Sequence, residues 1–256
     1  MIGKVEKCIT DAIARNGAIH LSLIDPQNVT PEIAGRLVSK LSDLGSTAVM
    51  IGGSTVISQR DLDEVVKEIK RNTALPTILF PNGVAGISEF ADAIFFSTLM
   101  NSSNPYYITG AQALGAPLVK RYGLETIPMG YLIVGTSPGA AGFVGQASPI
   151  PADKPELASM YALAAEYLGM RFVYLEAGSG SEKPVPSEMV RHVRKSVNAK
   201  LIVGGGIRTG NDASRIVQAG ADAIVTGTVV EEAGSKAGER IKELVQSIKR
   251  ASKRRA

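Results

Sequence analysis

Short apolar segments alternate with amphipathic segments about eight times along the 256-residue chain, and this alternation limits the possible folds more than any other feature. Strands that are joined by helices in this rhythm form parallel sheets through right-handed crossovers, and eight such units favour closure into a barrel. The sequence therefore predicts the α/β class, with one (β/α)8 TIM-like barrel domain spanning residues 1–256. The strand-like segments, which are mostly β-branched as in strands buried on both faces, are 18–24, 47–51, 77–80, 93–96, 129–134, 172–175, 201–203 and 223–225.

The intervening segments carry helix start and stop signals. Thr30 followed by Pro31 is typical of an N-cap with a first-turn proline, and Gly45 ends the helix that they open. A helix is also expected over about residues 1–16, where polar and apolar positions alternate as on a surface helix. No G-x-G-x-x-G follows the first strand, which weakens a dinucleotide-binding fold. Two further helices, opened by Asp153-Lys154-Pro155 and Gly210-Asn211-Asp212, are expected to end at Gly169 and Gly220.

Composition indicates a cytoplasmic protein. Apolar runs fall far below the ~20 residues that cross a bilayer, and the N-terminus does not resemble a signal peptide. The single cysteine, Cys8, cannot form an internal disulfide, which fits a reducing compartment. We also expect the protein to form an oligomer of identical chains.

Positive charge is concentrated near the C-terminus. Residues 236–256 have a local balance of +6 within a net charge of +4, and a basic tail is expected over about 249–256. One interpretation is a last helix whose cations complement its dipole, and another is peripheral contact with an anionic membrane surface. Because the tail lacks aromatic residues and no basic stripe lies elsewhere, nucleic acid is not an expected partner.

Glycine follows two late strands, in LIVGGGIRTG at 201–210 and AIVTGT at 223–228. In an eightfold barrel, the loops after the last two strands often bind phosphate through backbone N–H groups, and glycine permits the close approach. The sequence therefore predicts a phosphate-bearing substrate, although the glycines could instead serve a tight turn into a helix.

Three polar residues follow strands at the end of the barrel where chemistry takes place. Asp25 and Ser54 offer hard oxygen ligands suited to Mg²⁺ together with diphosphate oxygens. Glu176 ends an apolar strand and is a candidate general base. The structural alternatives are an Asx turn before Pro26 for Asp25, a helix cap for Ser54 and an ion pair for Glu176.

Other chemistries find little support. His20 begins the first strand and His192 lies within a helix, and no serine or cysteine stands at a nucleophile elbow, so the sequence does not support a hydrolytic triad. Lys200 precedes its strand, at the wrong end of the barrel for a Schiff-base lysine. Histidines and cysteines do not cluster as zinc or iron ligands would.

Seven motifs occur together in this chain: HLSLIDPQN, IGGST, LFPNG, NPYYITGAQ, MRFVYLEAGSG, VGGGIRTG and the closing TGT. Together they resemble the geranylgeranylglyceryl phosphate synthase family. The resemblance extends from about His20 to Glu232, and MRFVYLEAGSG and NPYYITGAQ are its most specific elements. The resemblance implies a (β/α)8 prenyltransferase of archaeal-type membrane lipid synthesis. Such an enzyme joins the geranylgeranyl group of geranylgeranyl diphosphate to the C3 oxygen of sn-glycerol 1-phosphate and releases diphosphate.

Site roles follow from the same resemblance. It implies that Asp25 and Ser54 hold Mg²⁺, while Glu176 would accept or orient the proton of the attacking hydroxyl. A long apolar groove for the prenyl chain is expected along NPYYITGAQALGAPL, with Tyr106 and Tyr107 near the chain, unless these rings only pack helix on barrel. The residues implied to contact glycerol 1-phosphate are Tyr174, Leu175, Glu176, Ala177, Gly178, Ser179, Gly180, Gly205, Gly206, Gly227 and Thr228.

The chain departs from the family pattern in three places. Gln27 and Asn28 stand where an acidic and a basic residue are usual, Thr228 stands where asparagine is common, and residues 135–138 replace a Glu-Pro-Gly-Gly-like turn. We expect the first departure to alter metal or diphosphate affinity and the third to alter the detailed diphosphate contacts. Two other functions stay open: a different phosphate-sugar barrel enzyme, which should show a paired acid and base or a strand-end lysine, and a non-catalytic barrel that binds polyprenyl or glycerol phosphates.

Overall fold

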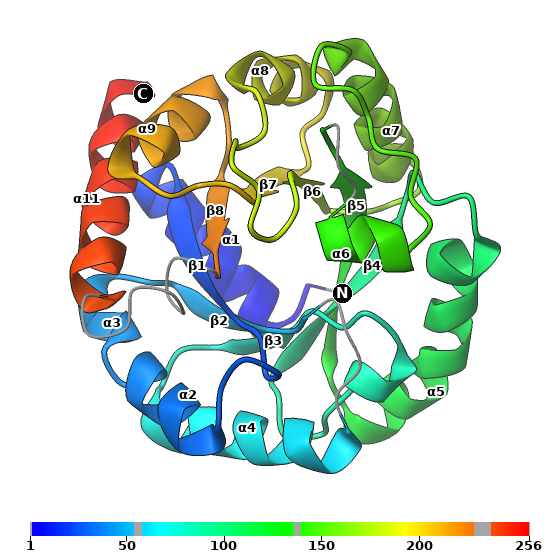
Figure 1. The fold of residues 1–256 in the computed structure, drawn as a ribbon, viewed down its shortest axis with the longest axis vertical. Coiled ribbons are helices and arrows are strands. Elements are labelled where there is room, and N and C mark those ends of the chain that lie inside the picture. The colour runs from blue at the N-terminus through cyan, green and yellow to red at the C-terminus, as the bar shows by residue number, and fades with distance from the viewer. Residues whose placement is uncertain (1, 54–57, 136–138, 228–236, 256) are drawn as a thin grey trace.

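The computed structural model describes residues 2–53, 58–135, 139–227 and 237–255. Eight parallel strands pair in sequence order, and the last pairs with the first, so the predicted barrel is confirmed (Figure 1). The strands are β1 (Ile19–Ile24), β2 (Ala48–Ile51), β3 (Thr77–Leu79), β4 (Ala93–Leu99), β5 (Glu125–Ile133), β6 (Phe172–Glu176), β7 (Lys200–Gly204) and β8 (Ala223–Thr226). The helices are α1 (Lys4–Asn16), α2 (Pro31–Val38), α3 (Leu41–Leu44), α4 (Gln59–Asn72), η1 (Val84–Gly86), η2 (Tyr106–Gly110), α5 (Ala111–Tyr122), α6 (Gly139–Val144), α7 (Pro155–Tyr167), α8 (Ser187–Ser196), α9 (Gly210–Ala219) and α11 (Ala237–Arg255).

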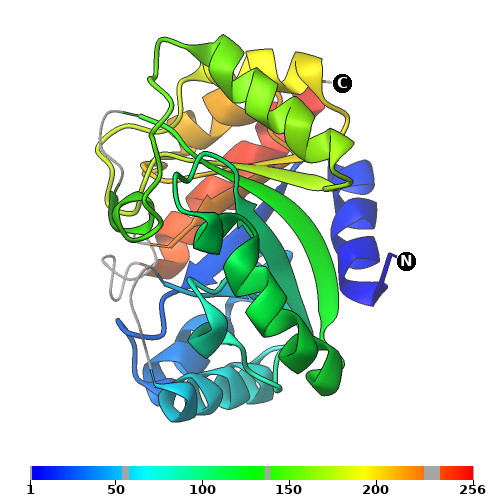
Figure 2. The same cartoon turned by 90° about the vertical axis from the view of Figure 1, so that its right-hand side faces the viewer.

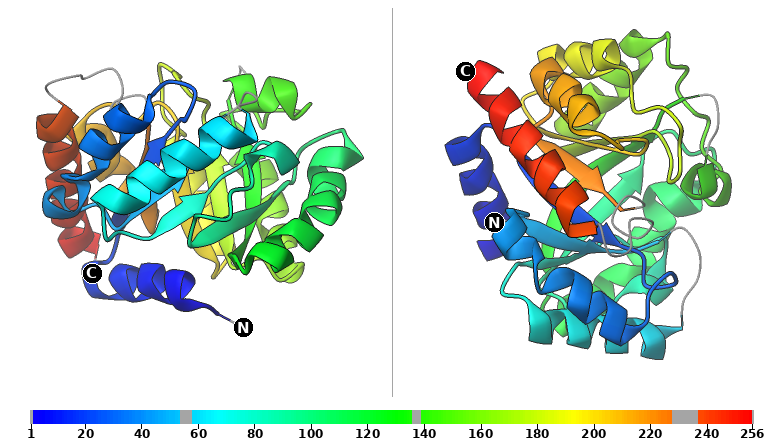
Figure 3. Two further views of the ribbon diagram at one scale, coloured as in Figure 1. Left: turned by 90° about the horizontal axis from the view of Figure 1, so that it is seen from below. Right: turned by 60° about the vertical axis from the view of Figure 1, so that its left-hand side comes forward.

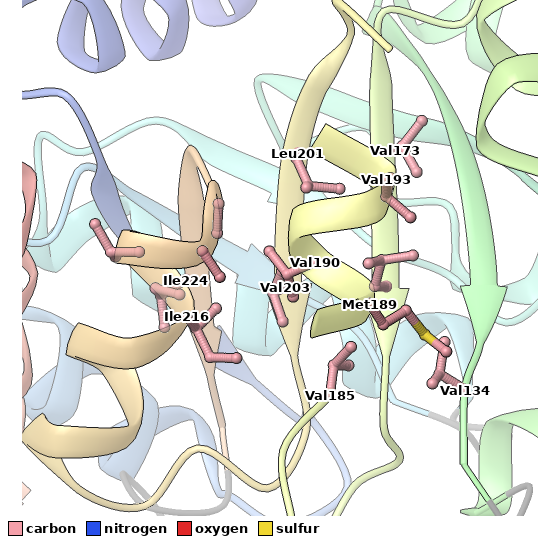
Figure 4. Close-up of a cluster of buried hydrophobic side chains, with 14 of the residues drawn as sticks. Val134, Val173, Val185, Met189, Val190, Val193, Leu201, Val203, Ile216 and Ile224 are labelled. Atoms are coloured by element: carbon pink, nitrogen blue, oxygen red, sulfur yellow. The ribbon is translucent and has the colours of Figure 1, made fainter. Parts of the chain in front are cut away.

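Alternate residues of each strand face opposite sides of the barrel wall. In β6, Phe172 and Tyr174 belong to the cluster inside the barrel, whereas Val173 and Leu175 belong to the cluster between strands and helices. Figure 4 shows part of this outer cluster, in which Val190 of α8 lies over Val203 of β7. Because both faces are buried, the strands read as nearly continuous apolar runs.

Helix α1 closes the end of the barrel at which the strands begin (Figures 2 and 3). Its Ile9 and Ile13 are buried in the same cluster as the interior strand residues. The carboxylate of Glu125, at the start of β5, accepts hydrogen bonds from two amides in the first turn of α1, and Arg171 pairs with the buried Glu6 of that turn. Apolar packing and neutralised charge therefore seal this end.

The ring of helices around the barrel is interrupted at one place. Between β3 and β4, where every residue is described, the chain forms only the single turn η1. A helix normally covers the outside of the strands at each such connection. Here α5 contacts both β4 and η1.

All eight predicted strands are present, and β4 and β5 extend furthest beyond the predicted apolar runs. Strand β5 begins at Glu125 instead of residue 129, because Pro128 and polar residues conceal the pattern, and β4 continues to Leu99. The helix expected from Thr30 to Gly45 is divided into α2 and α3. The hydroxyl of Ser39 bonds the carbonyl of Arg36 at the division, a local bond that competes with helix continuation.

The last helix, α11, runs toward the end of the barrel at which the strands begin. Its Ser252 packs against Gly17, which lies just before the start of β1. The basic residues from Lys249 onward therefore lie at the end where the strands begin, and they continue the helix as far as Arg255. Among the described residues, no helix is both long and apolar enough to cross a membrane.

Candidate active site

A pocket opens at the end of the barrel where the strands finish. On one side, β6 to β8 and their loops contribute Glu176, Ser179, Gly205 and Gly227 to its wall. On the other side the wall is formed by residues that are mostly apolar. These are Phe80, Val84, Ile87, Ile94, Phe96, Leu99, Tyr107, Ala111, Gly115 and Val144. We call these two sides the polar half and the apolar half.

Glu176 is the acidic group of the polar half. It ends β6, where it stands beside Ile133 of β5 and Gly204 of β7, and only 7% of it is exposed. One carboxylate oxygen accepts the amide of Gly178 at 2.6 Å, and the Tyr174 hydroxyl donates a further hydrogen bond to the carboxylate. Burial raises the pKa of Glu176, and these two bonds partly offset that rise. A carboxylate with a raised pKa at a pocket wall is suited to proton transfer.

Three aromatic rings form a cluster beneath Glu176. Phe80 stacks on Tyr174 with a centroid distance of 5.5 Å, and both contact Tyr131 edge-on. Burial, followed by the nearby Glu176 charge, raises the pKa values of both tyrosines, so each hydroxyl stays protonated. The sequence analysis did not identify Phe80 or Tyr131, because within an apolar strand an inward-facing aromatic residue looks like ordinary core.

The glycines after β7 and the glycine after β8 differ in why a larger residue would not suit the position. Gly205 and Gly206 have positive φ angles of 79° and 66°. A Cβ on Gly205 would lie 2.3 Å from Glu176 Oε1 and 2.7 Å from the amide of Gly178. Gly227, after β8, has room for a Cβ, since its nearest neighbour would be Leu23 at 3.4 Å. Gly205 is thus required by the loop itself, whereas Gly227 is open toward the pocket.

The predicted glycerol phosphate contacts divide between pocket wall and core. The wall includes Tyr174, Glu176, Ser179, Gly180, Gly205, Gly206 and Gly227. Leu175 is packed in the outer cluster between β6 and the helices, and Ala177 packs against that cluster. Gly178 supports the site by donating to Glu176, and Thr228 lies outside the described residues.

Arg208 is a cation at the pocket that sequence analysis missed. It lines the pocket directly after the β7 glycines and donates to the carbonyl of Gly180 at 3.3 Å. Its side chain is otherwise exposed. The signal was present in the motif GGGIRTG, whose arginine follows a predicted phosphate loop.

Asp25 follows β1, and its carboxylate lies beside the pocket wall. A Cβ on Gly53, which lines the pocket, would lie 2.4 Å from Asp25 Oδ1, so the glycine brings the backbone close to this carboxylate. Burial raises the pKa of Asp25, and the Gln27 amide, donating to Oδ1 at 3.0 Å, lowers it in part. Ser54 lies outside the described residues.

The donor set fits one kind of Mg²⁺ site. Within the described ranges, no three His, Cys, Asp or Glu side chains converge as metal ligands. Mg²⁺ often binds through one or two carboxylates and takes its other ligands from water and substrate phosphates. A single half-buried carboxylate at the edge of a pocket matches that arrangement.

The apolar half leaves the barrel through the interruption in the helix ring. Phe95 faces the barrel interior, whereas Ile94 and Phe96 belong to the outer cluster, yet all three line the pocket. The pocket therefore passes over the end of β4 toward the space between η1 and α5. A Cβ on Gly115 of α5 would lie 3.0 Å from Ile87 Cδ1, so the two walls approach closely there.

Part of the segment predicted to form the prenyl-chain wall lines this pocket. Tyr107, Ala111, Gln112 and Gly115 line the pocket, whereas Tyr106 is 37% exposed and contacts Tyr107 edge-on. Gln112 donates from Nε2 to the carbonyl of Ser97 at 2.6 Å, which fastens α5 to the end of β4.

Neither histidine is placed for catalysis. His20 is buried between Ser46 and Thr226, with both ring nitrogens 2.8 Å from hydroxyl oxygens, and burial lowers its pKa to about 4. His192 is exposed on α8 beside Glu188.

Comparisons with known proteins give a consistent result. A model described as the PcrB family matches residues 11–248. Proteins named geranylgeranylglyceryl phosphate synthase are 54% identical in Pyrococcus abyssi, over 98% of this chain and 99% of the relative, and 54% identical in Thermococcus gammatolerans, over 97% and 98%. A crystal structure of (S)-3-O-geranylgeranylglyceryl phosphate synthase from Thermoplasma acidophilum in complex with its substrate sn-glycerol-1-phosphate is 41% identical. The match covers 98% of this chain and 100% of the Thermoplasma acidophilum chain, with a TM-score of 0.91.

Proposed function

The chain belongs to the PcrB family, and from that membership and the pocket we propose that it is a prenyltransferase. It joins the geranylgeranyl group of geranylgeranyl diphosphate to the C3 hydroxyl of sn-glycerol 1-phosphate and releases diphosphate. The observation that carries this proposal is the division of one pocket into a polar half with a buried carboxylate and an apolar half that extends out of the barrel. Each half suits one of two chemically unlike substrates.

The polar half is proposed to hold the acceptor. Backbone amides in the loops that contain Gly205, Gly206 and Gly227 are suited to bind its phosphate, as loops after the last two strands of such barrels often do. Thr228 is expected to add a contact. Arg208 stands at the same side of the pocket and supplies a positive charge for phosphate or diphosphate.

Glu176 is proposed to accept the proton of the acceptor hydroxyl. The C3 oxygen bonds to the first carbon of the prenyl group while the bond from that carbon to diphosphate breaks, and the hydroxyl proton passes to the carboxylate. The raised pKa of Glu176 makes it a stronger base than an exposed carboxylate. The hydrogen bonds from Tyr174 and Gly178 hold it in one orientation.

Asp25 and Ser54 are proposed to hold Mg²⁺ between the protein and the donor diphosphate. A Mg²⁺ ion held there would neutralise diphosphate charge and so make diphosphate a better leaving group. Asp25 suits this role because its carboxylate adjoins the pocket wall at Gly53, next to the apolar half. Gln27 orients the carboxylate through its amide.

The apolar half is proposed to hold the prenyl chain. Phe96 and Ile87 line its outer part, and Tyr107 and Ala111 line the part above the barrel. Burial of an isoprenoid chain there is favourable by roughly 25 cal/mol per Å² of apolar surface. The diphosphate then lies where the two halves meet.

We also propose that the protein self-associates through α7. Most of the exposed face of this helix is apolar, with exposed fractions of 65% for Met160, 79% for Tyr167 and 71% for the adjoining Leu168. With Leu157 and Tyr161, these residues form a stripe at helical spacing. The exposed area is on the order of 500 Å² per chain, which is most of what a standard interface buries per partner.

Charge on α8, which packs beside α7, favours an antiparallel pair of chains. A two-fold axis across α7 would bring the acidic first turn of α8 toward Lys195 in the last turn of α8 in the second copy. Glu188 in that first turn also pairs with Arg191 and His192 of its own helix. Sedimentation of a Met160→Lys, Leu168→Lys double variant should show smaller particles than the wild type. Leu114→Lys, at an exposed position of α5, is the control and should leave the particle size unchanged. A monomeric wild type would contradict the proposal.

One experiment tests the proposed activity. Purified protein is incubated with Mg²⁺, radiolabelled sn-glycerol 1-phosphate and prenyl diphosphates of graded length, and the products are extracted into organic solvent. We expect labelled ether lipid, with the largest yield from the geranylgeranyl donor. If no donor gives extractable label, the chain is not a prenyltransferase of this kind.

A further inference from the structure

Helix α6 touches both halves of the pocket. At its first residue, a Cβ on Gly139 would lie 3.2 Å from the Cα of Gly178, two residues beyond Glu176. Farther along, Ala141 and Val144 of the helix and Gly145 just after it line the pocket. A Cβ on Gly145 would lie 2.3 Å from Leu99 of β4. The position of α6 therefore affects how both sides of the pocket are closed.

The segment that follows α6 is fastened to the loop after β4. Ser102 and Ala147 form an antiparallel bridge, the hydroxyl of Ser102 donates to the carbonyl of Gly145 at 2.6 Å, and the amide of Ser103 donates to Gln146. Gln146 is the single non-glycine residue with positive φ, at 51°, among the residues described. This conformation persists only where surrounding bonds impose it.

Asn101 joins the three backbones that meet at this point. Its Nδ2 donates to the carbonyls of Ile133 and Ser148 at 2.9 and 2.8 Å, and its Oδ1 accepts the amide of Ile133 at 3.2 Å. Its own carbonyl accepts the amide of Ser148 at 2.8 Å. With 3% of the residue exposed, these bonds have little competition from water.

We propose that Asn101 is a positioning residue that holds α6 over the pocket. It acts by tying the ends of β4 and β5 to residues 145–150, so that Val144 and Gly145 stay against the apolar half. The proposal rests on the proposed function for its effect on the prenyl donor, while the anchoring itself can be measured without substrate.

The side chain is chemically specific for this task. An amide supplies two donors to two carbonyls and one acceptor to an amide, and no aliphatic side chain of similar size can do so. Aspartate has the same shape but, when ionised, places charge against the carbonyls of Ile133 and Ser148. We therefore expect Asn101→Asp to be no better than Asn101→Ala, although it conserves volume.

The test compares Asn101→Ala and Asn101→Asp with Thr77→Val. Thr77 is also buried and loses a hydroxyl bond to Asp92 at 2.9 Å, but it lies where β3 begins, at the other end of the barrel. In the Asn101 variants, amides of residues 139–150 should exchange hydrogen roughly tenfold faster than in the wild type, as expected from the loss of a buried hydrogen bond. In Thr77→Val they should not.

Steady-state kinetics give the second readout. The KM for the prenyl diphosphate should rise roughly tenfold in the Asn101 variants, with a change below about twofold for glycerol 1-phosphate. Exchange and KM equal to those of Thr77→Val would overturn the proposal, and so would faster exchange with unchanged donor KM. An inactive wild type would contradict the proposed function instead, while the exchange comparison would still decide whether Asn101 anchors α6.

Discussion

Where the strands begin, the charged groups of the barrel are matched by partners within the chain, whereas where the strands end they face a pocket. Glu6 is buried against Arg171, and Glu125 accepts two amides of α1. At the opposite end, Glu176 is buried beside donors that are too few to restore an ordinary pKa. The difference indicates that one end contributes stability and the other is arranged for chemistry, at some cost in stability.

The comparison is tested most severely at Asp25. Asp25→Ala should reduce turnover by on the order of 10³-fold or more, because the diphosphate would lose its metal-mediated charge neutralisation. Binding of glycerol phosphate, measured by calorimetry, should stay nearly normal. Near-normal turnover would remove Asp25 from the mechanism, and loss of folding would show that its turn is structural.

Glu176→Gln tests the carboxylate of the polar half. Turnover should fall by roughly 10²-fold, the usual range for loss of a general base, with little change in prenyl diphosphate affinity. The thermal midpoint should stay equal or rise, since a buried charge with a raised pKa is removed. An unchanged rate across the pH profile would contradict the assignment.

The sealed end should show the opposite pattern. Arg171→Met leaves the buried carboxylate of Glu6 without its ion-pair partner, and the free energy of unfolding should fall by about 2 kcal/mol. Turnover by the folded variant should stay within about twofold of the wild type. Lys7→Met, which removes an exposed ion pair with Asp11, is the control and should cost well under 1 kcal/mol in chemical denaturation.

The two glycine loops separate binding from folding within the pocket end. Gly227→Ala should weaken glycerol phosphate binding roughly tenfold without lowering the thermal midpoint, because a Cβ fits there but obstructs the phosphate. Gly205→Ala should lower the midpoint as well, since its positive φ and close contacts leave no room. Equal loss of prenyl diphosphate binding in Gly227→Ala would show that this glycine also serves loop structure.

The smallest effect is expected from His20 as the pH falls. Its pKa is about 4 in the folded protein against 6.5 in an unfolded chain, so below pH 6.5 the unfolded state binds more protons and stability declines toward pH 4. By pH 5.5 the free energy of unfolding has fallen by about 1 kcal/mol from its value at neutral pH because of His20. The free energy of unfolding, measured by chemical denaturation at a series of pH values, should decline more steeply with falling pH in the wild type than in His20→Gln. Parallel declines would contradict this prediction.

The sequence predicted the barrel because eight buried strands leave a strong apolar signal. It predicted Glu176 because a carboxylate at the end of such a strand is unusual. Arg208 could have been found from the motif GGGIRTG, whose arginine directly follows a predicted phosphate loop. Phe80 and Asn101 could not, since their roles depend on contacts between segments far apart in the chain. For Asn101 the partners are residues 133 and 148, and no spacing in the sequence indicates that these backbones meet.

The interruption between β3 and β4 has a consequence for the size of ligand that such a barrel can accept. Eight strands fix the width of a barrel, so a ligand confined to its axis can be only as large as that width permits. Because the helix layer is open between β3 and β4, the pocket extends sideways out of the barrel, and the number of strands does not limit its length in that direction. Ligand length and reaction chemistry then reside in separate layers of the protein, and residues along η1 and α5 can change without altering the strand ends.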